Sequence, residues 1–305
     1  MVRMRKSRLR TLFLLCAALS SAPVSCAPPD VMPGTVSQSL IVNGVRRTFS
    51  LHVPTSYRTG HPAPLVMLLH GDGATGVNIE RMTGMSDKAE KEGFIAVYPD
   101  GIGSPAAWQV LDSAGRENQD VAYLSQLFDT LQQLYAIDRK RIYVAGHSTG
   151  GMMAYRLGVD LDDRIAGIGV SSALLGRILS SDTVNPSPVT LVAIHGKADN
   201  IVPYDGKIGE RDFSAEYLSV PASVDSWAKR NGCDGGATEV ARRNGTVVER
   251  SYAGCDSGSA VTLVTIADMT HVWAGDLHGI RVFFKGTGVN ATDKMWAVFR
   301  SHPKR

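Results

Sequence analysis

The sequence lacks the patterns that build metal centres and membrane spans. Its 305 residues hold four cysteines, and no Cys-x-x-Cys or His-x-x-x-His pattern suggests a metal site. Beyond the N-terminus no stretch approaches the roughly 18 consecutive apolar residues that predict a transmembrane helix. Internal repeats are also missing, and with 44% hydrophobic and 20% charged residues the composition is that of a soluble globular protein. We therefore expect a globular chain without a metal or an integral membrane span.

The first 27 residues differ in composition from the rest. Five basic residues precede a short apolar core, "TLFLLCAAL" at residues 11–19, and a small, proline-containing stretch follows. This layout predicts a cleaved signal peptide, because the core is too short to span a bilayer as a stable helix. Since the segment has no acidic residue, its removal takes the net charge from +3 to about −2, which leaves no basic surface for nucleic acid. We expect residues 28–305 to form a single domain that is secreted or periplasmic.

Cys233 and Cys255 remain when Cys16 and Cys26 of the N-terminal segment are set aside. They lie 22 positions apart in a polar, Gly-rich region. In an exported protein such a pair predicts a disulfide. Cys26 leaves open a lipid anchor at the mature N-terminus, although residues 23–25 fit a lipid-attachment signal poorly.

Alternating strand and helix patterns predict the fold class. Residues 37–54 form two alternating runs around Asn43-Gly44, a pair that favours tight hairpin turns. Later apolar runs suit strands buried on both faces, and they lie at residues 64–71, 94–101, 141–146, 165–173, 189–196 and 261–267. Helical spacing occurs at residues 120–137, 151–160, 223–232 and 291–303. This order predicts an α/β fold with a mostly parallel central sheet, helices on both faces and an N-terminal antiparallel hairpin.

The stretch "GHSTGG" at residues 146–151 lies where a strand pattern gives way to a helix pattern. Gly-x-Ser-x-Gly at such a turn is the nucleophile elbow, in which a Cβ at either glycine would clash. The turn exposes the serine hydroxyl at a helix N-terminus, where amides and the helix dipole favour negative charge. The pattern predicts Ser148 as a nucleophile.

A serine nucleophile needs a base and an acid that orients the base, which on α/β hydrolases follow in the order Ser, Asp or Glu, His. Asp199 in "AIHGKADNIVPY" and His271 in "IADMTHVWAG" each follow a strand, so both fall at the carboxyl edge of the sheet with Ser148. We assign Asp199 as the acid and His271 as the base. Structural roles are favoured for most other histidines. Alternatives stay open at both positions, namely His278 for the base and Asp205 or Asp268 for the acid.

Two further groups of residues are candidates for contact with the substrate. This fold binds the oxyanion with the amide after the nucleophile and with one from the loop after an early strand. These are the backbone amides of Thr149 and, in "LLHGDGATG", Asp72. Trp108 and Trp273 are candidate apolar walls for the acyl group, with ordinary packing as the alternative for each.

Together these motifs resemble the polyhydroxybutyrate depolymerase and feruloyl esterase-like group of α/β hydrolases. The resemblance runs from about residue 40 to about residue 302. It rests on "VMLLHGDG", "VYPDG", "RIYVAGHSTGGMMAYRL", "IHGKADNIVPYDG", "SWAKRNGC", "HVWAG" and "MWAVF", in that order. It implies the same triad, Ser148, Asp199 and His271. It also implies secreted esterases that act on hydroxyalkanoate polyesters, on feruloylated or acetylated plant polysaccharides, or on smaller acyl esters.

The chain departs from the family pattern at two places that bear on the substrate. Asp72 lies where the family usually has a small residue or cysteine, and its carboxylate would oppose an oxyanion unless it points away. Met269-Thr270 precede the histidine where the family commonly has Gly-Gly, and Trp273-Ala274-Gly275 follow in place of Trp-Pro-Gly.

The sequence therefore predicts a secreted serine carboxylic-ester hydrolase that works through an acyl-enzyme and needs no metal or organic cofactor. Its partner is an ester, either small, polysaccharide-linked or a polyester, and its oligomeric state is not predicted. A serine peptidase or amidase could use the same triad, but no added domain or acidic cluster is present to hold a peptide amine. A non-catalytic binding protein could keep the fold, but an intact triad argues against it.

Overall fold

The computed structural model describes residues 33–111, 118–180, 186–208, 211–212, 216–275 and 288–305. The chain divides into two units, Met1–Asp30 and Val31–Arg305, and every described residue belongs to the second. The predicted signal peptide, Cys16 and Cys26 lie outside the described residues. In the part of the chain that is described, no helix combines the length and the hydrophobicity needed to cross a membrane.

Helices and strands alternate along most of the described chain, as the sequence predicts. In chain order they are β1 (Gly34–Val42), β2 (Val45–Val53), β3 (Ala63–Leu69), α1 (Gly76–Thr83), α2 (Met85–Glu92), β4 (Ile95–Pro99), α3 (Gln119–Leu134), β5 (Ile137–His147), α4 (Thr149–Asp160), β6 (Gly167–Ser171), α5 (Arg177–Ser180), β7 (Thr190–Gly196), β8 (Lys207–Ile208), β9 (Arg211–Asp212), α6 (Val220–Arg230), β10 (Ala237–Arg242), β11 (Val247–Tyr252), β12 (Val261–Ile266) and α7 (Ala291–Phe299).

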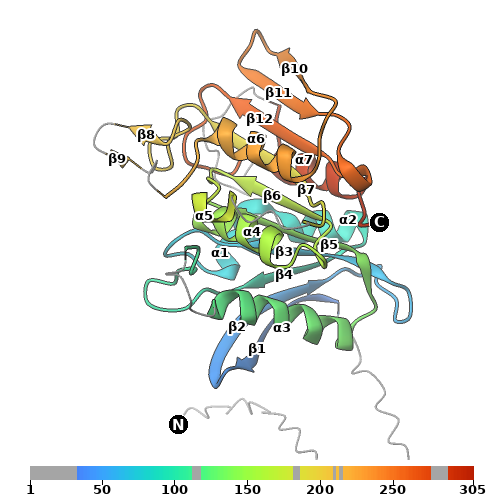
Figure 1. The fold of residues 1–305 in the computed structure, drawn as a ribbon. Helices are drawn as coiled ribbons and strands as arrows, with labels where there is room; N and C mark the ends of the chain where they lie inside the picture. The colour runs from blue at the N-terminus through green and yellow to red at the C-terminus, as the bar shows by residue number, and fades with distance from the viewer. Residues whose placement is uncertain (1–32, 112–117, 181–185, 209–210, 213–215, 276–287) are drawn as a thin grey trace, which may run out of the picture. The chain divides into compact units, whose positions relative to one another are not determined.

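One large sheet organises the fold. Among the described residues ten strands pair in the order β1-β2-β4-β3-β5-β6-β7-β12-β11-β10 (Figure 1). The strands from β4 to β12 in this order run parallel, and the pairs at both edges are antiparallel. The N-terminal hairpin turns at Asn43 and Gly44, whose φ values are 49° and 77°. This confirms the predicted α/β-hydrolase fold with its N-terminal hairpin.

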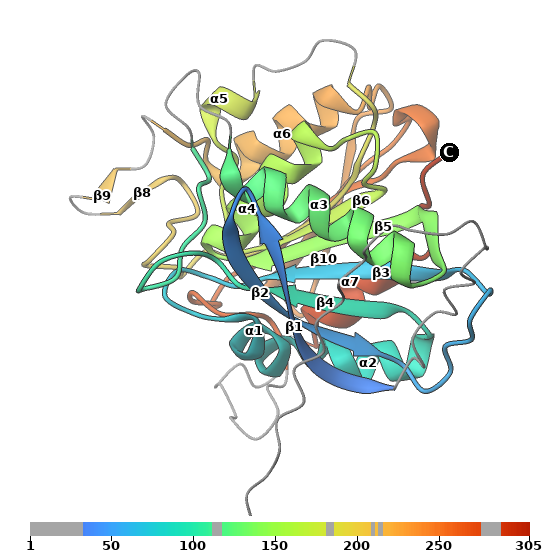
Figure 2. The same ribbon diagram turned by 90° about the horizontal axis from the view of Figure 1, so that it is seen from below.

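Helices cover both faces of the sheet. Side chains of successive strand residues point to opposite faces, so in β3 Leu65, Met67 and Leu69 pack in one core and Val66 and Leu68 in the other. The first core lies under α3, α4, α5 and α6, and the second under α1, α2 and α7 (Figure 2). Each fully buried aliphatic side chain stabilises the folded state by about 1.5–3 kcal/mol. The two cores therefore fix the central strands and the loops that follow them.

A buried ion pair ties the N-terminal hairpin to α3. Asn118 caps this helix through its side-chain oxygen, and Asp120 lies in the first turn. Asp120 has no exposed surface and accepts hydrogen bonds from Arg47 Nη2 and the Gln109 amide, both at 2.7 Å. Asp120 therefore acts structurally, in line with the helix-start role that its position predicts.

A second hairpin, β10–β11, was not predicted. Its turn holds Arg243, Asn244 and Gly245 at positive φ, so the sequence carried the same Asn-Gly signal as the first hairpin. The residues of β10 are all exposed, and the strand therefore lacks the apolar alternation by which half-buried strands are recognised. The hairpin adds two antiparallel strands to the sheet beside β12.

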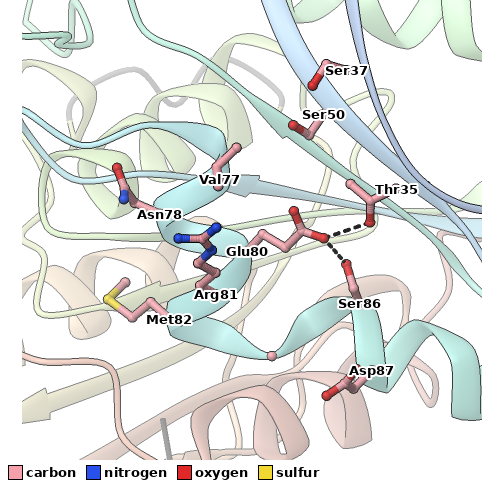
Figure 3. A pocket seen from close by; sticks show the side chains of 11 residues that line it. Thr35, Ser37, Ser50, Val77, Asn78, Glu80, Arg81, Met82, Ser86 and Asp87 are labelled. Atoms are coloured by element: carbon pink, nitrogen blue, oxygen red, sulfur yellow. Dashed lines mark hydrogen bonds between the residues drawn. The ribbon is translucent and has the colours of Figure 1, made fainter. Parts of the chain in front are cut away.

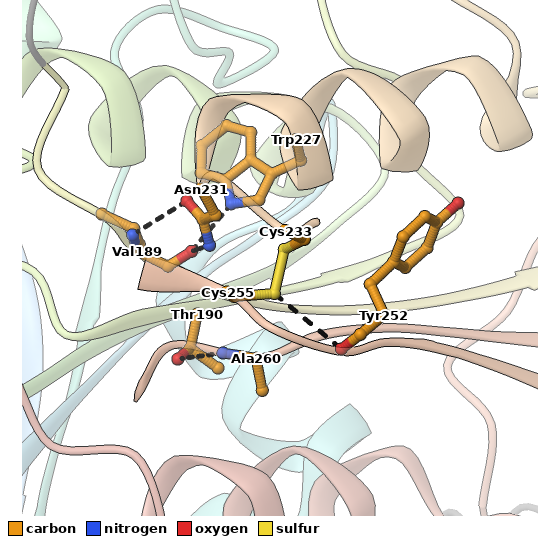
Figure 4. Close-up of a disulfide and its surroundings, with 8 residues drawn as sticks. All are labelled: Val189, Thr190, Trp227, Asn231, Cys233, Tyr252, Cys255 and Ala260. Carbon is orange, nitrogen blue, oxygen red and sulfur yellow. Dashed lines mark hydrogen bonds between the residues drawn. A yellow bond between two sulfur atoms is a disulfide. The ribbon is translucent and has the colours of Figure 1, made fainter. Parts of the chain in front are cut away.

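A disulfide between Cys233 and Cys255 joins the end of α6 to the chain that follows β11, as predicted. Beside it, the Trp227 indole N–H donates to the Val189 carbonyl oxygen at 2.8 Å. The Asn231 side chain accepts from the Val189 amide at 3.2 Å and donates to its carbonyl oxygen at 2.7 Å (Figure 4). Helix α6 is therefore fixed both to β11 and to the start of β7.

Replacing Cys233 and Cys255 together by serine should lower the free energy of unfolding by about 3 kcal/mol. The disulfide closes a loop with a sequence separation of 22, and this constraint on the unfolded chain has roughly that magnitude. Equilibrium urea unfolding of the two exported proteins measures the difference. Activity of the folded double variant at 25 °C should be unchanged, and a loss of stability below about 1 kcal/mol would contradict the prediction.

Candidate active site

Ser148 occupies the sharp turn between β5 and α4. Its backbone, with φ 56° and ψ −127°, adopts a conformation that residues other than glycine rarely take. The Ser148 amide donates to the Ser171 carbonyl oxygen of β6 at 3.0 Å, and the Ser148 carbonyl accepts from Met152. These bonds hold the turn, so the strand, the turn and the helix of a nucleophile elbow are all present.

The glycines on either side of Ser148 are required by crowding. A Cβ on Gly146 would lie 2.3 Å from the backbone of Gly150. A Cβ on Gly150 would lie 2.1 Å from the Leu69 carbonyl oxygen of β3. Both distances are shorter than any real Cβ contact, so the clash that the motif predicts is present at each position.

Asp199 and His271 follow β7 and β12, which are neighbours in the sheet. His271 Nδ1 lies 2.9 Å from Asp199 Oδ2 and 3.2 Å from Oδ1, as expected when the ring donates its Nδ1–H to the carboxylate. Gly196 permits this approach, because a Cβ there would lie 1.7 Å from the Met269 carbonyl oxygen. The structure thus brings together the two residues predicted as acid and base.

Asp199 is buried, and its partners favour the charged carboxylate. Oδ1 accepts from the amides of Ile201 at 3.0 Å and Val202 at 2.9 Å. His195 Nε2 donates to the Val202 carbonyl oxygen and lies 3.4 Å from Oδ2. Burial alone would raise the pKa of Asp199, but hydrogen bonds from His195, His271 and the Val202 amide outweigh it and hold the pKa well below its usual value. Asp199 is therefore ionised at neutral pH.

The sequence left Asp205 and Asp268 open as the acid and His278 open as the base. Asp205 and Asp268 are both exposed, whereas the carboxylate that contacts His271 belongs to Asp199. His278 lies outside the described residues.

A pocket of about 320 Å³ brings Ser148 and His271 together at the carboxyl edge of the sheet. Four apolar side chains contribute to its wall, those of Ala74, Ile79, Met82 and Ile201. Within the described residues Ser148 Oγ makes no hydrogen bond to His271. In enzymes without substrate this contact is often long and tightens only in the complex.

Two backbone amides beside Ser148 fit the predicted oxyanion hole. Gly71 packs against the serine, since a Cβ on it would lie 3.3 Å from Ser148 Cβ, and Asp72 follows it. Thr149 is the first residue of α4, where an amide has no acceptor within the helix. Neither the Asp72 nor the Thr149 amide has a hydrogen-bond acceptor in the described part of the chain. Their role as oxyanion donors stays a prediction.

Trp108 and Trp273, the candidate substrate walls, are 7% and 2% exposed and do not line this pocket. The Trp108 indole N–H donates to the His70 carbonyl oxygen at 2.8 Å, and the two rings lie 4.9 Å apart. The Trp273 indole N–H donates to Thr292 Oγ1 at 3.0 Å. Both tryptophans therefore have packing roles. The hydrogen bond from Trp108 also stabilises the end of β3 that leads to Gly71.

Asp72 has an exposed side chain and is the only acidic residue among those that line the pocket. Its amide and its carboxylate have opposite consequences for an oxyanion. The amide can stabilise negative charge, whereas the carboxylate repels it.

Asp72→Asn should raise kcat/KM on a neutral ester about twofold to threefold. Two unit charges ~8 Å apart in a water-like dielectric repel by about 0.5 kcal/mol, and the substitution removes this repulsion. The gain should be larger for an ester whose acyl group is anionic. Steady-state kinetics on p-nitrophenyl butyrate and on a p-nitrophenyl succinate monoester measure both effects. Asp205→Asn, exposed and outside the pocket, should change neither rate, and a D72N variant that matches the wild type on both esters would contradict the prediction.

A larger pocket of about 920 Å³ adjoins the first and shares Asn78 and Met82 of α1 with it. Its wall includes a fixed carboxylate. Glu80 Oε1 accepts from Thr35 Oγ1 at 2.8 Å and from Ser86 Oγ at 2.7 Å (Figure 3). The sequence analysis missed these residues because it did not predict α1, although Thr75 and Asn78 form a capping box at its start.

Comparison with known proteins agrees with the fold. The model of a phospholipase/carboxylesterase family matches residues 56–219, which is more than half of the chain and includes Ser148 and Asp199. Among curated proteins, the chain is 28% identical to the putative esterase NocK of Nocardia uniformis subsp. tsuyamanensis, over 85% of this chain and 79% of that protein. It is 27% identical to feruloyl esterase B of Piromyces equi over 70% of this chain, and spans 40% of the length of that relative.

The fold is also found among solved structures. An acetyl xylan esterase from Aspergillus awamori superposes with a TM-score of 0.65 and 16% identity, covering 87% of this chain and 99% of that one. The family match, together with the nucleophile elbow and the strand order of the sheet, shows that the chain belongs to the phospholipase/carboxylesterase family of α/β hydrolases.

Proposed function

We propose that the chain is a serine carboxylic-ester hydrolase that forms an acyl-enzyme on Ser148. The observation that carries this proposal is the buried Asp199 carboxylate paired with His271 at 2.9 Å, in a pocket whose wall also includes Ser148. Membership of a carboxylesterase family and relatives named as esterases support the reaction class.

The first half of the reaction forms the bond between Ser148 Oγ and the acyl carbon and breaks the bond between that carbon and the alcohol oxygen, with His271 carrying one proton from the serine to the alcohol. His271 Nε2 takes the hydroxyl proton as Ser148 Oγ attacks the ester carbonyl carbon. The carbonyl electron pair moves to oxygen, whose charge is met by the amides of Asp72 and Thr149. Asp199 holds Nδ1–H, which leaves Nε2 free as the base and stabilises the imidazolium. The imidazolium then protonates the departing alkoxide, and the acyl group remains on Ser148.

Water completes the cycle by the same steps. His271 takes a proton from water as the hydroxide oxygen attacks the acyl carbon. Collapse of the second tetrahedral intermediate breaks the bond to Ser148 Oγ, and the imidazolium returns its proton to the serine. The products are one carboxylic acid and one alcohol for each water consumed.

The pocket supports a short acyl or hydroxycinnamoyl group as substrate. Its volume of about 320 Å³ lies at the small end of ligand sites, and much of its wall is apolar. Relatives named feruloyl esterase and acetyl xylan esterase support feruloyl or acetyl esters of plant polysaccharides. The adjoining pocket beside α1 would take the alcohol part when this is a sugar chain, while hydroxyalkanoate oligomers are the further substrate class that the sequence resemblance implies.

We also propose that the enzyme works outside the cytoplasm. Two features support export, namely the N-terminal basic and apolar segment and the Cys233–Cys255 disulfide, which persists in oxidising compartments.

The enzyme should hydrolyse esters far faster than amides that share the same acyl group, by at least about 10³-fold in kcat/KM. An alkoxide leaves with little help, whereas an amide nitrogen must be protonated and its substrate held in register. Paired p-nitrophenyl butyrate and butyryl p-nitroanilide measure the ratio, and methyl ferulate and acetylated xylo-oligosaccharides extend it to the proposed substrates. Similar values for the ester and the anilide would instead assign the chain as an amidase or peptidase.

Labelling with a fluorophosphonate separates an enzyme from a binding protein that keeps the fold. The wild-type protein should be labelled at Ser148, and prior denaturation should abolish labelling. A folded wild-type protein that neither reacts with the probe nor cleaves any ester of the panel would overturn the proposed function.

A further inference from the structure

His147 fills the variable position of the Gly-x-Ser-x-Gly motif and contacts the proposed base. Its ring lies 4.8 Å from the His271 ring between centroids, at an angle of 43°. His147 is the last residue of β5, where it pairs with Ser171 of β6, and it is 8% exposed. It lines the pocket that holds Ser148. A rigid strand end therefore carries an aromatic ring directly against the base.

The imidazole of His271 needs such a neighbour. Its one hydrogen-bonded partner in the described part of the chain is Asp199, which holds the ring at Nδ1. The χ2 torsion of histidine is broad, so a bond at one nitrogen leaves the ring free to turn about that bond. A second ring packed against it restricts this rotation.

Nδ1 of His147 is buried and has no hydrogen-bond partner within the described residues. A buried polar atom without a partner destabilises the folded state. Burial, reinforced by the nearby His271, lowers the pKa of His147 to about 3, so the ring is neutral where His271 must gain a proton. A neutral ring can lie against the imidazolium without repelling it.

We propose that His147 is a positioning residue, whose ring packs on the His271 imidazole and holds it between Asp199 and Ser148. This inference rests on the proposed function, because it assumes that His271 is the base.

Two substitutions test the proposal. His147→Ala removes the ring, and His147→Phe keeps a planar ring without its nitrogens. On p-nitrophenyl butyrate, His147→Ala should lower kcat on the order of 30-fold and change KM less than about twofold, because a misplacement of about 1 Å can cost ~100-fold in rate. His147→Phe should stay within about threefold of the wild-type kcat. His61→Ala, an exposed histidine outside the pocket, should have no effect.

Circular dichroism and thermal unfolding establish that each variant is folded. A His147→Ala variant with wild-type kcat would overturn the proposal, as would a folded His147→Phe variant that loses as much as His147→Ala. A rise in KM at unchanged kcat would also overturn it, because it would place His147 on the substrate.

The rate of fluorophosphonate labelling gives a second test on His147→Ala, independent of the His147→Phe variant. The rate of fluorophosphonate labelling at Ser148 should fall in parallel with kcat, since both depend on the base, and an unchanged labelling rate would overturn the proposal. Failure of the proposed function itself would look different. It would appear as a wild-type protein without ester hydrolysis or labelling, whatever residue stands at position 147.

Discussion

Ser148→Ala should lower kcat on ester substrates by about 10⁶-fold and leave the fold intact, as in other enzymes that lose a triad serine. The hydroxyl supplies the bond that forms in the first step, and nothing else described in the pocket replaces it. The fold should persist because alanine keeps the same Cβ in the strained turn, and Ser148 Oγ makes no hydrogen bond in the described part of the chain. Steady-state kinetics and thermal unfolding measure the two expectations.

Ser172 offers a matched control for this experiment. It is also a buried serine at positive φ, 52°, and its hydroxyl has no partner among the described residues. It does not line the pocket that contains Ser148. Ser172→Ala should therefore keep the wild-type kcat. A Ser148→Ala variant that retained more than about 1% of activity would refute the nucleophile assignment.

Asp199→Asn should lower kcat by about 10⁴-fold, the loss known for the corresponding change in a serine protease triad. An amide can turn its NH₂ group to His271 Nδ1, which favours the tautomer whose Nε2 carries the proton and cannot act as a base. It also removes the charge that stabilises the imidazolium. The variant should fold, because the amide oxygen can still accept from the Ile201 and Val202 amides.

The two carboxylates left open by the sequence serve as controls for the acid. Asp205→Asn and Asp268→Asn change exposed residues that do not line the pocket, so both variants should stay within about threefold of the wild-type kcat. The assignment of Asp199 would be wrong if either control lost activity by about 10³-fold or more while folded Asp199→Asn remained active.

The parallel core could be predicted, and the candidate triad residues could be placed at one sheet edge, because their signals are local. Strands buried on both faces read as apolar runs, and β3, β7 and β12 each fall within one or two residues of such a run. The elbow is recognised from the local Gly-x-Ser-x-Gly pattern, although the crowding that requires Gly150 comes from Leu69 of β3. Once strand order in this fold class is assumed, residues just after β7 and β12 must lie at the edge that holds Ser148.

Other parts of the site depend on contacts that no local pattern records. Helices α1 and α2 have eight residues each, are largely polar and bury three and two residues, so they offer few apolar positions by which a helix could be recognised. Whether an indole faces a pocket or the core is decided by distant partners, such as Thr292 for Trp273. The ring contact between His147 and His271 joins residues 124 positions apart in sequence, and only the folded sheet places them together.

The order of strands in the sheet also bears on when the enzyme can first act. Strand β12 inserts between β7 and β11 and is followed by the loop with His271, so the residues of the proposed triad come from widely separated stages of synthesis. A nascent chain that has emerged through β7 already holds Ser148 and the β3 loop, but it has no base. Pairing of strands so far apart in sequence is also slow. With His271 as the proposed base, esterase activity would arise only after nearly the whole chain has been made.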